Sequence, residues 1–170
     1  MQTQPHLITF AGVVGSSKTP IASYLSWQLG LPVFNTDAIR SEVQEDLLRT
    51  DEAEHRARRR QRLEELLARK RDIIIDASVD REWKDFRSTV LGLGYQPYII
   101  SLDLSRELVE QLYTAKGYDE SAKRIETLLE QHEIFLRDFS HDVHLHIGDE
   151  QFPDRLSLCF KGVQKWLSGK

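Results

Sequence analysis

The chain has 170 residues, of which 40% are apolar and 29% are charged, and its formal net charge is −4 at pH 7. This composition is typical of a folded soluble protein and argues against disorder. The negative net charge argues against a protein-wide field that attracts nucleic acid, although it leaves local basic patches open. A single cysteine, Cys159, excludes an internal disulfide framework and a multi-cysteine metal cluster.

The amino-terminal residues MQTQPHLITF lack the cationic start and the long apolar run of a signal peptide. No stretch approaches the ~20 apolar residues that a membrane span requires. We therefore expect a cytoplasmic protein with no membrane partner. The length predicts one domain over residues 1–170, because the sequence has no internal repeat and no linker-like segment.

The first predicted elements surround the most specific pattern in the chain, which is FAGVVGSSKTP from Phe10 to Pro20. An apolar run precedes it and a segment with helical spacing follows, so the context is strand, glycine-bearing loop and helix. This context is typical of a phosphate-binding P-loop, whose pattern is Gly, four residues, Gly, Lys and Ser or Thr. Gly12, Lys18 and Thr19 fit the pattern, whereas Ser17 stands where the second glycine is required.

Backbone N–H groups of such a loop turn inward and, with the start of the following helix, form an anion-binding nest. Lys18 would reach the β- and γ-phosphates of ATP, and the Thr19 hydroxyl would bind Mg²⁺. Ser17 would fit the loop with a negative φ, and its hydroxyl would donate to a phosphate. The alternative is an ordinary strand-to-helix turn. The predicted nucleotide-binding residues are Gly12, Val13, Val14, Gly15, Ser16, Ser17, Lys18, Thr19 and Pro20.

The remaining elements alternate along the chain. Strands are predicted over residues 7–11, 31–35, 72–76, 97–102 and 143–147, and helices over residues 19–29, 38–48, 50–71, 81–91, 106–115, 120–137 and 152–167. Thr36 or Asp37 is predicted to cap the second helix. The alternation predicts an α/β fold, a five-stranded parallel doubly wound sheet with helices on both faces. Ligands of such sheets bind at the carboxyl ends of the strands.

Three further side chains at these strand ends suit phosphoryl transfer. Asp76 would hold Mg²⁺ directly or through water, with capping of the next helix as its other role. Asp37 would accept the proton of a substrate hydroxyl. Arg40, three residues later on the same helix face, would bind a phosphate or carboxylate of the acceptor. The alternative is a capping Asp and a surface Arg, and the spacing favours the functional pair.

The segments GVVGSSKT, LGLPVFNTDAIRSEV, DIIIDASVDREWKDF and YIISLDLSRELVEQL, in this order, resemble the small P-loop kinases of the nucleoside-monophosphate-kinase fold. The resemblance is greatest to the polynucleotide-kinase-like and zeta-toxin-like branch, and it extends to gluconate and shikimate kinases. It implies that Asp37 is the general base, that Arg40 helps to hold the acceptor, and that Asp76 lies near the metal. It implies transfer of the ATP γ-phosphoryl group to a hydroxyl of a small-molecule or nucleotide acceptor, and a helical lid-like segment around residues 105–137.

Two departures from the family pattern favour an alternative function. Ser17 replaces a glycine, and the segment from Glu110 to Lys116 reads EQLYTAK where the family usually has E-R-L-x-x-R. The missing arginines contact the nucleotide and the transferring phosphoryl group in that family. Lys116 stands one position beyond the second missing arginine, and Lys123, Arg124 or Arg137 on the following helix are candidates to substitute for the pair. Because lost transition-state charge costs several orders of magnitude in rate, a catalytically weak or inactive nucleotide-binding module is the first alternative.

A second alternative is nucleic-acid binding through the basic helix over residues 55–71, which contains HRARRRQR and Arg69-Lys70-Arg71. The helix also carries acidic residues, and a solvated face with balanced charge is therefore favoured over a nucleic-acid site.

Other chemistry-bearing side chains are predicted to be structural. His144 and His146 share a strand face, but no third metal ligand is apparent, and an edge strand with a half-exposed face is favoured. Cys159 lies in an apolar stretch and is predicted to be buried. Packing positions within helices are predicted for Trp27, Trp83 and Trp166.

Overall fold

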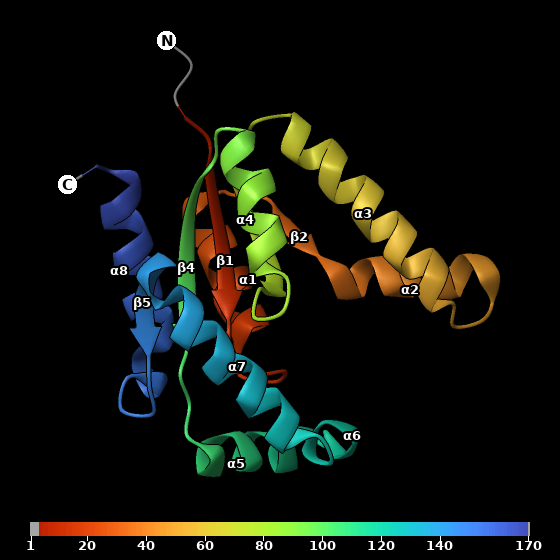
Figure 1. Cartoon of the computed structure of the whole chain (residues 1–170), viewed down its shortest axis with the longest axis vertical. Helices are drawn as coiled ribbons and strands as arrows, with labels where there is room; N and C mark the ends of the chain where they lie inside the picture. The colour runs from red at the N-terminus through yellow and green to blue at the C-terminus, as the bar shows by residue number, and fades with distance from the viewer. Residues whose placement is uncertain (1–3, 170) are drawn as a thin grey trace.

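The computed structural model describes residues 4–169, so the first three residues of the amino-terminal segment discussed above lie outside it. Five strands form one parallel sheet in the order β2-β3-β1-β4-β5 (Figure 1). The strands are β1 (His6–Ala11), β2 (Val33–Asn35), β3 (Ile73–Ser78), β4 (Gln96–Leu102) and β5 (Val143–Ile147). The helices are α1 (Lys18–Leu29), α2 (Thr36–Leu47), α3 (Glu52–Ala68), α4 (Trp83–Gly92), α5 (Arg106–Lys116), α6 (Asp119–Ala122), α7 (Ile125–Phe139) and α8 (Arg155–Leu167), with short 3₁₀ helices η1 (Ser140–Asp142) and η2 (Phe152–Asp154).

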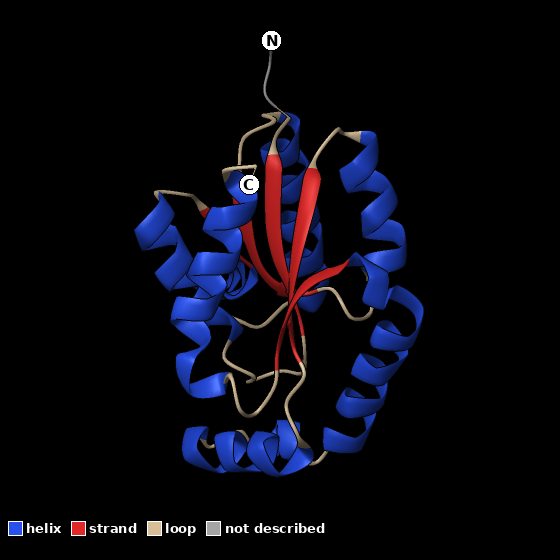
Figure 2. Ribbon diagram, turned by 90° about the vertical axis from the view of Figure 1, so that its left-hand side faces the viewer, coloured by secondary structure: helices blue, strands red, loops and turns tan. Residues whose placement is uncertain are grey.

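Helices cover both faces of the sheet (Figure 2). Successive residues of a strand point to opposite faces of the sheet. The packing partners of two neighbouring residues of β4 therefore show which helices cover each face. Ile100 belongs to the buried cluster that also contains residues of α1 and α8. Ile99 belongs to a separate cluster with Trp83 of α4 and Phe135 of α7. The predicted doubly wound α/β sheet is confirmed.

The central strands are buried along nearly their whole length, as expected for parallel strands covered on both faces. The edge strand β5 differs, because His144 and His146 are exposed and alternate with less exposed apolar residues. The prediction of a half-exposed edge strand is therefore confirmed. Cys159 is fully buried, also as predicted.

The helix predicted over residues 120–137 is wrong, because the structure divides this segment into α6 and α7. Arg124 breaks the helix with φ −116° and ψ 15°. The two pieces differ in burial: α6 exposes all its residues to some extent, whereas α7 buries Ile125, His132 and Phe135. The break lets α7 turn its apolar stripe onto the sheet while α6 stays at the carboxyl edge (Figure 1).

Three smaller predictions are also corrected. Asn35, rather than Thr36 or Asp37, caps α2, because its side-chain oxygen accepts the N–H groups of residues 37 and 38. Trp27 does not pack within the protein, since it is 77% exposed. The last helix begins at Arg155, after the 3₁₀ turn that contains Pro153.

No helix within residues 4–169 combines the length and the apolar character needed to cross a bilayer.

Candidate functional site

The loop between β1 and α1 has the left-handed backbone positions that a glycine-bearing anion nest requires. Gly12 has φ +124° and Gly15 has φ +76°. Close packing adds a second requirement for glycine, since a Cβ on Gly12 would lie 3.0 Å from the Leu102 Cβ. A Cβ on Gly15 would lie 2.9 Å from the Tyr113 ring. Both residues are therefore fixed as glycine by conformation and by space.

Ser17 occupies the loop in a way that differs from the sequence-based expectation. Its φ is +81°, whereas a negative φ was expected, so the serine adopts a left-handed conformation that glycine takes more readily. Its hydroxyl oxygen accepts a hydrogen bond from Arg155 Nε at 2.9 Å, which leaves the hydroxyl proton able to donate. The contact joins the loop to the start of α8, and it helps to hold a backbone conformation that is costly for a residue with a Cβ.

Lys18 folds back across the loop. Its ammonium group donates to the carbonyl oxygens of Gly12 and Val13, at 2.8 and 2.5 Å, and to the Ser16 hydroxyl at 3.2 Å. Burial lowers the pKa of Lys18 to about 8, against the opposing attraction of Asp80 and Asp76. A desolvated cation held at the mouth of an anion nest gains when a negatively charged ligand binds.

Thr19 and Asp76 come together beside the loop. The Thr19 hydroxyl donates to Asp76 Oδ1 at 3.2 Å, and the Asn35 amide donates to Asp76 Oδ2 at 2.9 Å. Burial raises the pKa of Asp76 above its usual value. A cation would relieve this cost, and a hydroxyl beside a carboxylate provides oxygen ligands of the kind that Mg²⁺ prefers.

Two structural points bear on this metal assignment. Asp76 caps no helix, since β3 continues to Ser78 and Glu82 stands at the start of α4, so the capping alternative is wrong. Among the described residues, no group of three or more His, Cys, Asp and Glu side chains is arranged to hold a metal. A Mg²⁺ ion at Thr19 and Asp76 would therefore need phosphate oxygens and water, which are its common ligands in nucleotide sites.

Asp37 is exposed in the first turn of α2, and its N–H donates to Asn35 Oδ1 at 2.8 Å. β2 is an edge strand, and β3 separates it from β1 and the loop. Asp37 nevertheless lies close enough to Asp76 for its charge to contribute to the raised pKa of that carboxyl group. Arg40 points elsewhere in this arrangement, because its guanidinium group forms an ion pair with Glu52.

Two cations at the loop were not identified as loop contacts from the sequence. Lys116, at the end of α5, donates to the Gly15 carbonyl at 2.6 Å, and Arg155 contacts Ser17. Burial and the neighbouring Arg155 lower the pKa of Lys116. Neither side chain forms a salt bridge with a carboxylate within residues 4–169.

Two of the residues considered above as substitutes for the missing lid arginines form ion pairs with acidic neighbours. Lys123 pairs with Glu120, and Arg137 pairs with Asp138.

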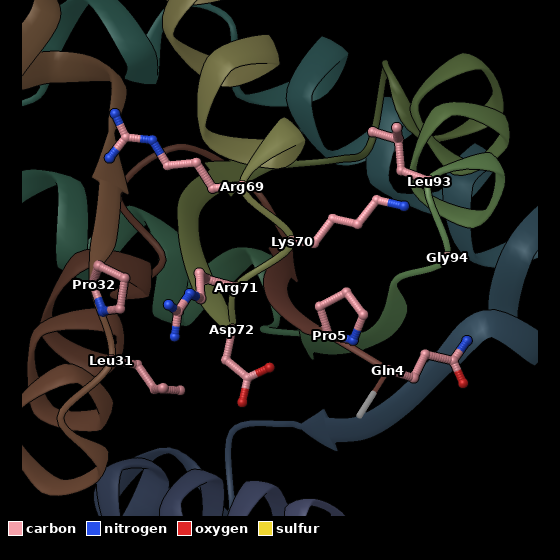
Figure 3. Close-up of a pocket in the computed structure, with 10 residues that line it drawn as sticks. All are labelled: Gln4, Pro5, Leu31, Pro32, Arg69, Lys70, Arg71, Asp72, Leu93 and Gly94. Carbon is pink, nitrogen blue, oxygen red and sulfur yellow. The ribbon is translucent and has the colours of Figure 1, made fainter. Parts of the chain in front are cut away.

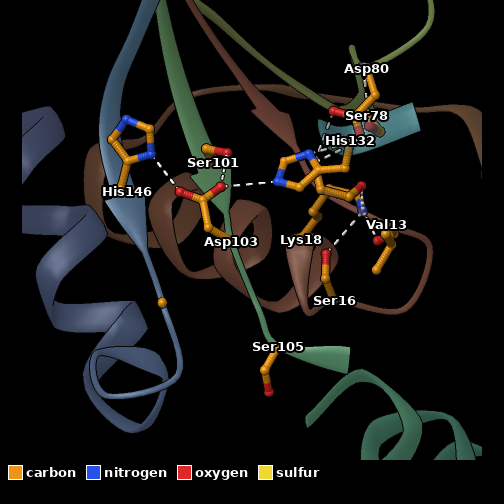
Figure 4. A network of polar contacts seen from close by, with 12 residues as sticks. Val13, Ser16, Lys18, Ser78, Asp80, Ser101, Asp103, Ser105, His132 and His146 are labelled. Atoms are coloured by element: carbon orange, nitrogen blue, oxygen red, sulfur yellow. Dashed lines mark hydrogen bonds and ion pairs between the residues drawn. The ribbon is translucent and has the colours of Figure 1, made fainter. Parts of the chain in front are cut away.

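A buried polar network lies against the same loop (Figure 4). Asp80 accepts the Gly12 N–H with both carboxylate oxygens, at 3.0 and 3.2 Å. His132 of α7 contacts Asp80 with Nδ1 and Asp103 with Nε2. Asp103, which follows β4, also contacts His146 at 2.5 Å. Asp103 directly follows the strand predicted over residues 97–102, and His132 lies within the helix predicted over residues 120–137, but the sequence gave no sign that these two side chains meet.

Three arginines of the basic stretch form ion pairs with acidic residues, most of which belong to neighbouring elements. Arg58 pairs with Asp46 and Glu54. Arg59 pairs with Glu82, and Arg62 pairs with Glu42. These pairs bear out the predicted charge-balanced face for this part of α3, although most of the partners lie outside the helix.

The end of the basic stretch borders a hollow of about 1150 Å³ (Figure 3). Arg69, Lys70, Arg71 and Asp72 line it together with residues that precede β1 and β4. It therefore lies at the amino ends of the strands, away from the loop that follows β1. In a parallel α/β sheet the carboxyl edge is the usual ligand site, so the loop remains the candidate functional site.

A family profile described as "AAA domain" matches residues 7–141, which include the loop, Asp37, Asp76 and the segment from α5 to α7. The chain belongs to this AAA domain family. A search among curated protein sequences found no significant match.

Solved kinase structures have the same fold as this AAA domain protein. A gluconokinase from Sinorhizobium meliloti is 17% identical with a TM-score of 0.67, and the match covers 99% of this chain and 97% of that one. A shikimate kinase from Bacteroides thetaiotaomicron is 14% identical with a TM-score of 0.61, with coverages of 96% and 98%. The APS kinase of Mycobacterium tuberculosis, solved with AMPPNP and APS, is 16% identical with a TM-score of 0.60, with coverages of 95% and 98%. The fold is thus that of P-loop kinases.

Proposed function

We propose that this protein binds ATP with Mg²⁺ and transfers the γ-phosphoryl group to a hydroxyl of a small-molecule or nucleotide acceptor. The observation that carries the proposal is the meeting of Thr19 and Asp76 beside a loop with two left-handed glycines and a buried lysine. When bound, ATP would supply the phosphoryl group, and Mg²⁺ would neutralise charge on the phosphates.

Within this proposal, Lys18 exchanges its contacts with the loop carbonyls for contacts with phosphate oxygens. Thr19 and Asp76 hold the metal, and Asp37 accepts the proton of the acceptor hydroxyl. Arg40 binds the acceptor once it leaves Glu52, its partner in the structure. The exposed position of Asp37, close to Asp76, leaves room for an acceptor at the same edge of the sheet.

The cations absent from the expected lid positions are replaced, in our proposal, by Lys116 and Arg155. Both contact the loop, and neither is neutralised by a carboxylate salt bridge in the described part of the chain. Positive charge placed there would stabilise the phosphoryl group during transfer. This placement favours an active kinase over an inactive nucleotide-binding module.

We further infer that the chain is a single domain whose segment around residues 105–137 acts as the lid. Within the P-loop kinases, the Thr36-Asp37-x-x-Arg40 element supports the polynucleotide-kinase-like and zeta-toxin-like branch. The similar structures include a gluconokinase, a shikimate kinase and an APS kinase, and these proteins widen the set of acceptors to be tested.

Calorimetric titration of ATP with Mg²⁺ into the wild-type protein and into Lys18→Ala tests the nucleotide-binding step. We expect binding by the wild type and a loss of roughly two orders of magnitude in Lys18→Ala, because each charge-assisted hydrogen bond lost costs about 1.5–3 kcal/mol. Lys161→Ala, a change on α8, is the matched control and should bind as the wild type does. Absence of binding by the folded wild type would refute the proposal.

Binding without phosphoryl transfer to any acceptor in a panel of sugars, shikimate-like alcohols, nucleosides and oligonucleotides would favour the inactive module. Salt-sensitive oligonucleotide binding that disappears on neutralising Arg58, Arg59 and Arg60 would favour the nucleic-acid alternative. The ion pairs of Arg58 and Arg59 make that second outcome the less expected one.

A further inference from the structure

His132 fills a junction between two strand ends. Its side chain is 8% exposed, with Nδ1 lying 3.2 Å from Asp80 Oδ2 and Nε2 lying 3.0 Å from Asp103 Oδ1 (Figure 4). Asp80 lies in the segment between β3 and α4, and Asp103 follows β4. One imidazole ring of α7 therefore touches both segments at the carboxyl edge of the sheet.

The two contacts define the charge of the ring. A neutral imidazole has one N–H, so it would donate to one carboxylate and present a lone pair to the other. Only the imidazolium donates to both. Burial opposes protonation, but the hydrogen bonds and charges of Asp103 and Asp80 outweigh it and raise the pKa of His132 to about 9.

The other charged and polar groups around this junction come from four elements. His146 of β5 and the Ser101 hydroxyl of β4 contact Asp103. Lys18 of α1 lies close enough to Asp80 for that carboxylate to oppose the lowering of its pKa. Ser78 at the end of β3 accepts the Asp80 N–H at 3.3 Å. None of these groups contacts both carboxylates, whereas His132 contacts Asp80 and Asp103 directly.

Asp80 transmits this charge balance to the phosphate-binding loop. Both of its oxygens accept the N–H of Gly12, the first residue of the loop. The Asp80 side chain is itself 8% exposed, so its negative charge requires a compensating cation. His132 supplies that cation from α7, and the chain of contacts runs from α7 through Asp80 to the loop backbone.

We propose that His132 is a positioning residue of the nucleotide site, which as an imidazolium holds Asp80 on the Gly12 N–H and balances two carboxylates beside the anion-binding loop. The inference rests on the proposed nucleotide binding and adds a link between the helix α7 and the loop. Loss of the cation would free Gly12 and leave uncompensated negative charge where phosphates must bind.

Two readouts test this role in the full chain, with His132→Gln compared to the wild type. The first is hydrogen exchange of the Gly12 amide by NMR, which needs no nucleotide. The second is the Kd for ATP with Mg²⁺ at pH 7. We expect faster exchange of Gly12 and a Kd weaker by roughly tenfold, the effect of one lost charge-assisted hydrogen bond.

His141→Gln is the matched control, because it makes the same chemical change at a histidine whose side chain is 67% exposed. It should leave both readouts unchanged. The double variant His132→Gln with Asp103→Asn removes one negative charge together with the positive one, and it should recover most of the ATP affinity. A purely structural role for His132 predicts no recovery in the double variant.

Unchanged Gly12 exchange and unchanged affinity in folded His132→Gln would overturn the proposal. If His132→Gln does not fold, ¹⁵N NMR of the wild-type imidazoles decides, since the proposal requires both nitrogens of His132 to carry a proton at pH 7. A neutral His132 would equally overturn it. Failure of the wild type to bind ATP would defeat the proposed function, while the Gly12 and imidazole measurements would still report on the link.

Discussion

Ser17 combines an unfavourable backbone conformation with a favourable side-chain contact. Its φ of +81° costs about 1–2 kcal/mol for a residue with a Cβ. Its hydroxyl accepts from Arg155 Nε, which contributes about 0.5–1.5 kcal/mol or somewhat more because the donor is charged. The two terms nearly cancel, and this balance explains how the loop tolerates serine at this position.

Substitution of Ser17 separates the two terms. Ser17→Ala keeps the backbone cost and loses the hydrogen bond. We therefore expect its free energy of unfolding to be about 1 kcal/mol lower than that of the wild type. Ser17→Gly loses both and should stay within about 0.5 kcal/mol of the wild type. Denaturant unfolding of the three proteins measures these differences. Equal stability of the alanine and glycine variants would contradict the left-handed conformation.

Asp37 is expected to act in chemistry and to contribute little to stability, because it is exposed and its backbone N–H makes the capping contact. For Asp37→Asn, we expect phosphoryl transfer to fall roughly 10²- to 10⁴-fold, the usual contribution of a general base. ATP affinity and thermal stability should not change. Asp46→Asn, on the same helix, serves as the control in the same transfer assay.

Sequence patterns predicted the side chains of the loop and Asp76 beside it, but they did not identify the neighbours that hold them. Thr19 and Asp76 were predictable because both follow from strand ends and a known spacing. Arg155 lies 138 residues from Ser17, and Asp80 lies 68 residues from Gly12. Contacts over such separations depend on how α8 and the β3–α4 segment pack, and no local pattern carries that information.

The start of α2 is joined to the proposed metal site through Asn35. Asn35 accepts the N–H groups of Asp37 and Ala38 through Oδ1 and donates to Asp76 through Nδ2. One side chain thus fixes the first turn of α2 and orients the carboxylate of β3. The position of Asp37 relative to Asp76 follows from this shared residue.

Substitution of Asn35 tests the cap. Asn35→Ala should lower the free energy of unfolding by about 1–2 kcal/mol, because two N–H groups of α2 lose their acceptor. Asn35→Ser keeps a capping oxygen and loses only the amide contact with Asp76, so it should recover about half of that loss. Urea unfolding followed by circular dichroism provides the comparison. A serine variant as unstable as the alanine variant would argue against capping.

Most helices and all five strands could be predicted because their apolar periodicity and glycine punctuation are strong. The segment after α5 was predicted less well, since the charged residues around Arg124 carry no helix-breaking signal. The break depends on the burial of Ile125 under neighbouring helices, which is a property of packing and not of propensity.

The molecule as a whole responds to pH through groups at the carboxyl edge of the sheet. His132 has a pKa raised from 6.5 to about 9, so the stability that its protonation provides is present below pH 6.5 and is lost as the pH rises through about 9. Lys18 acts in the opposite direction, because burial lowers its pKa to about 8 and its deprotonation relieves a cost of folding.

Comparison of the wild type with His132→Gln isolates the histidine contribution, because both proteins contain Lys18. Between about pH 6 and about pH 9.5 the melting temperature of the wild type should fall more than that of the variant. The two curves should converge at the alkaline end. Parallel curves over this range, measured by calorimetry, would show that His132 is not protonated in the folded protein.

The overall architecture was predictable because alternating strands and helices allow few topologies. The place of β2 in the sheet was harder to predict from the sequence. In the order β2-β3-β1-β4-β5, β3 lies between β2, which precedes Asp37, and β1, which precedes the loop. Sequence order alone does not distinguish the neighbour of a central strand from its second neighbour. Sequence patterns therefore predicted which residues lie at the carboxyl edge of the sheet, but not the distances among them.

Trp27 lies in the last turn of α1 and gives the protein an optical reporter at the opposite end of this helix from Lys18 and Thr19. It is 77% exposed, whereas Trp83 is 1% exposed and donates its indole N–H to Asp142. Water relaxes around an exposed indole in its excited state, so Trp27 should emit at longer wavelength and should be quenched by iodide well before Trp83. The emission of Trp27 therefore offers a label-free signal from the carboxyl-terminal end of α1, separable from that of the buried Trp83.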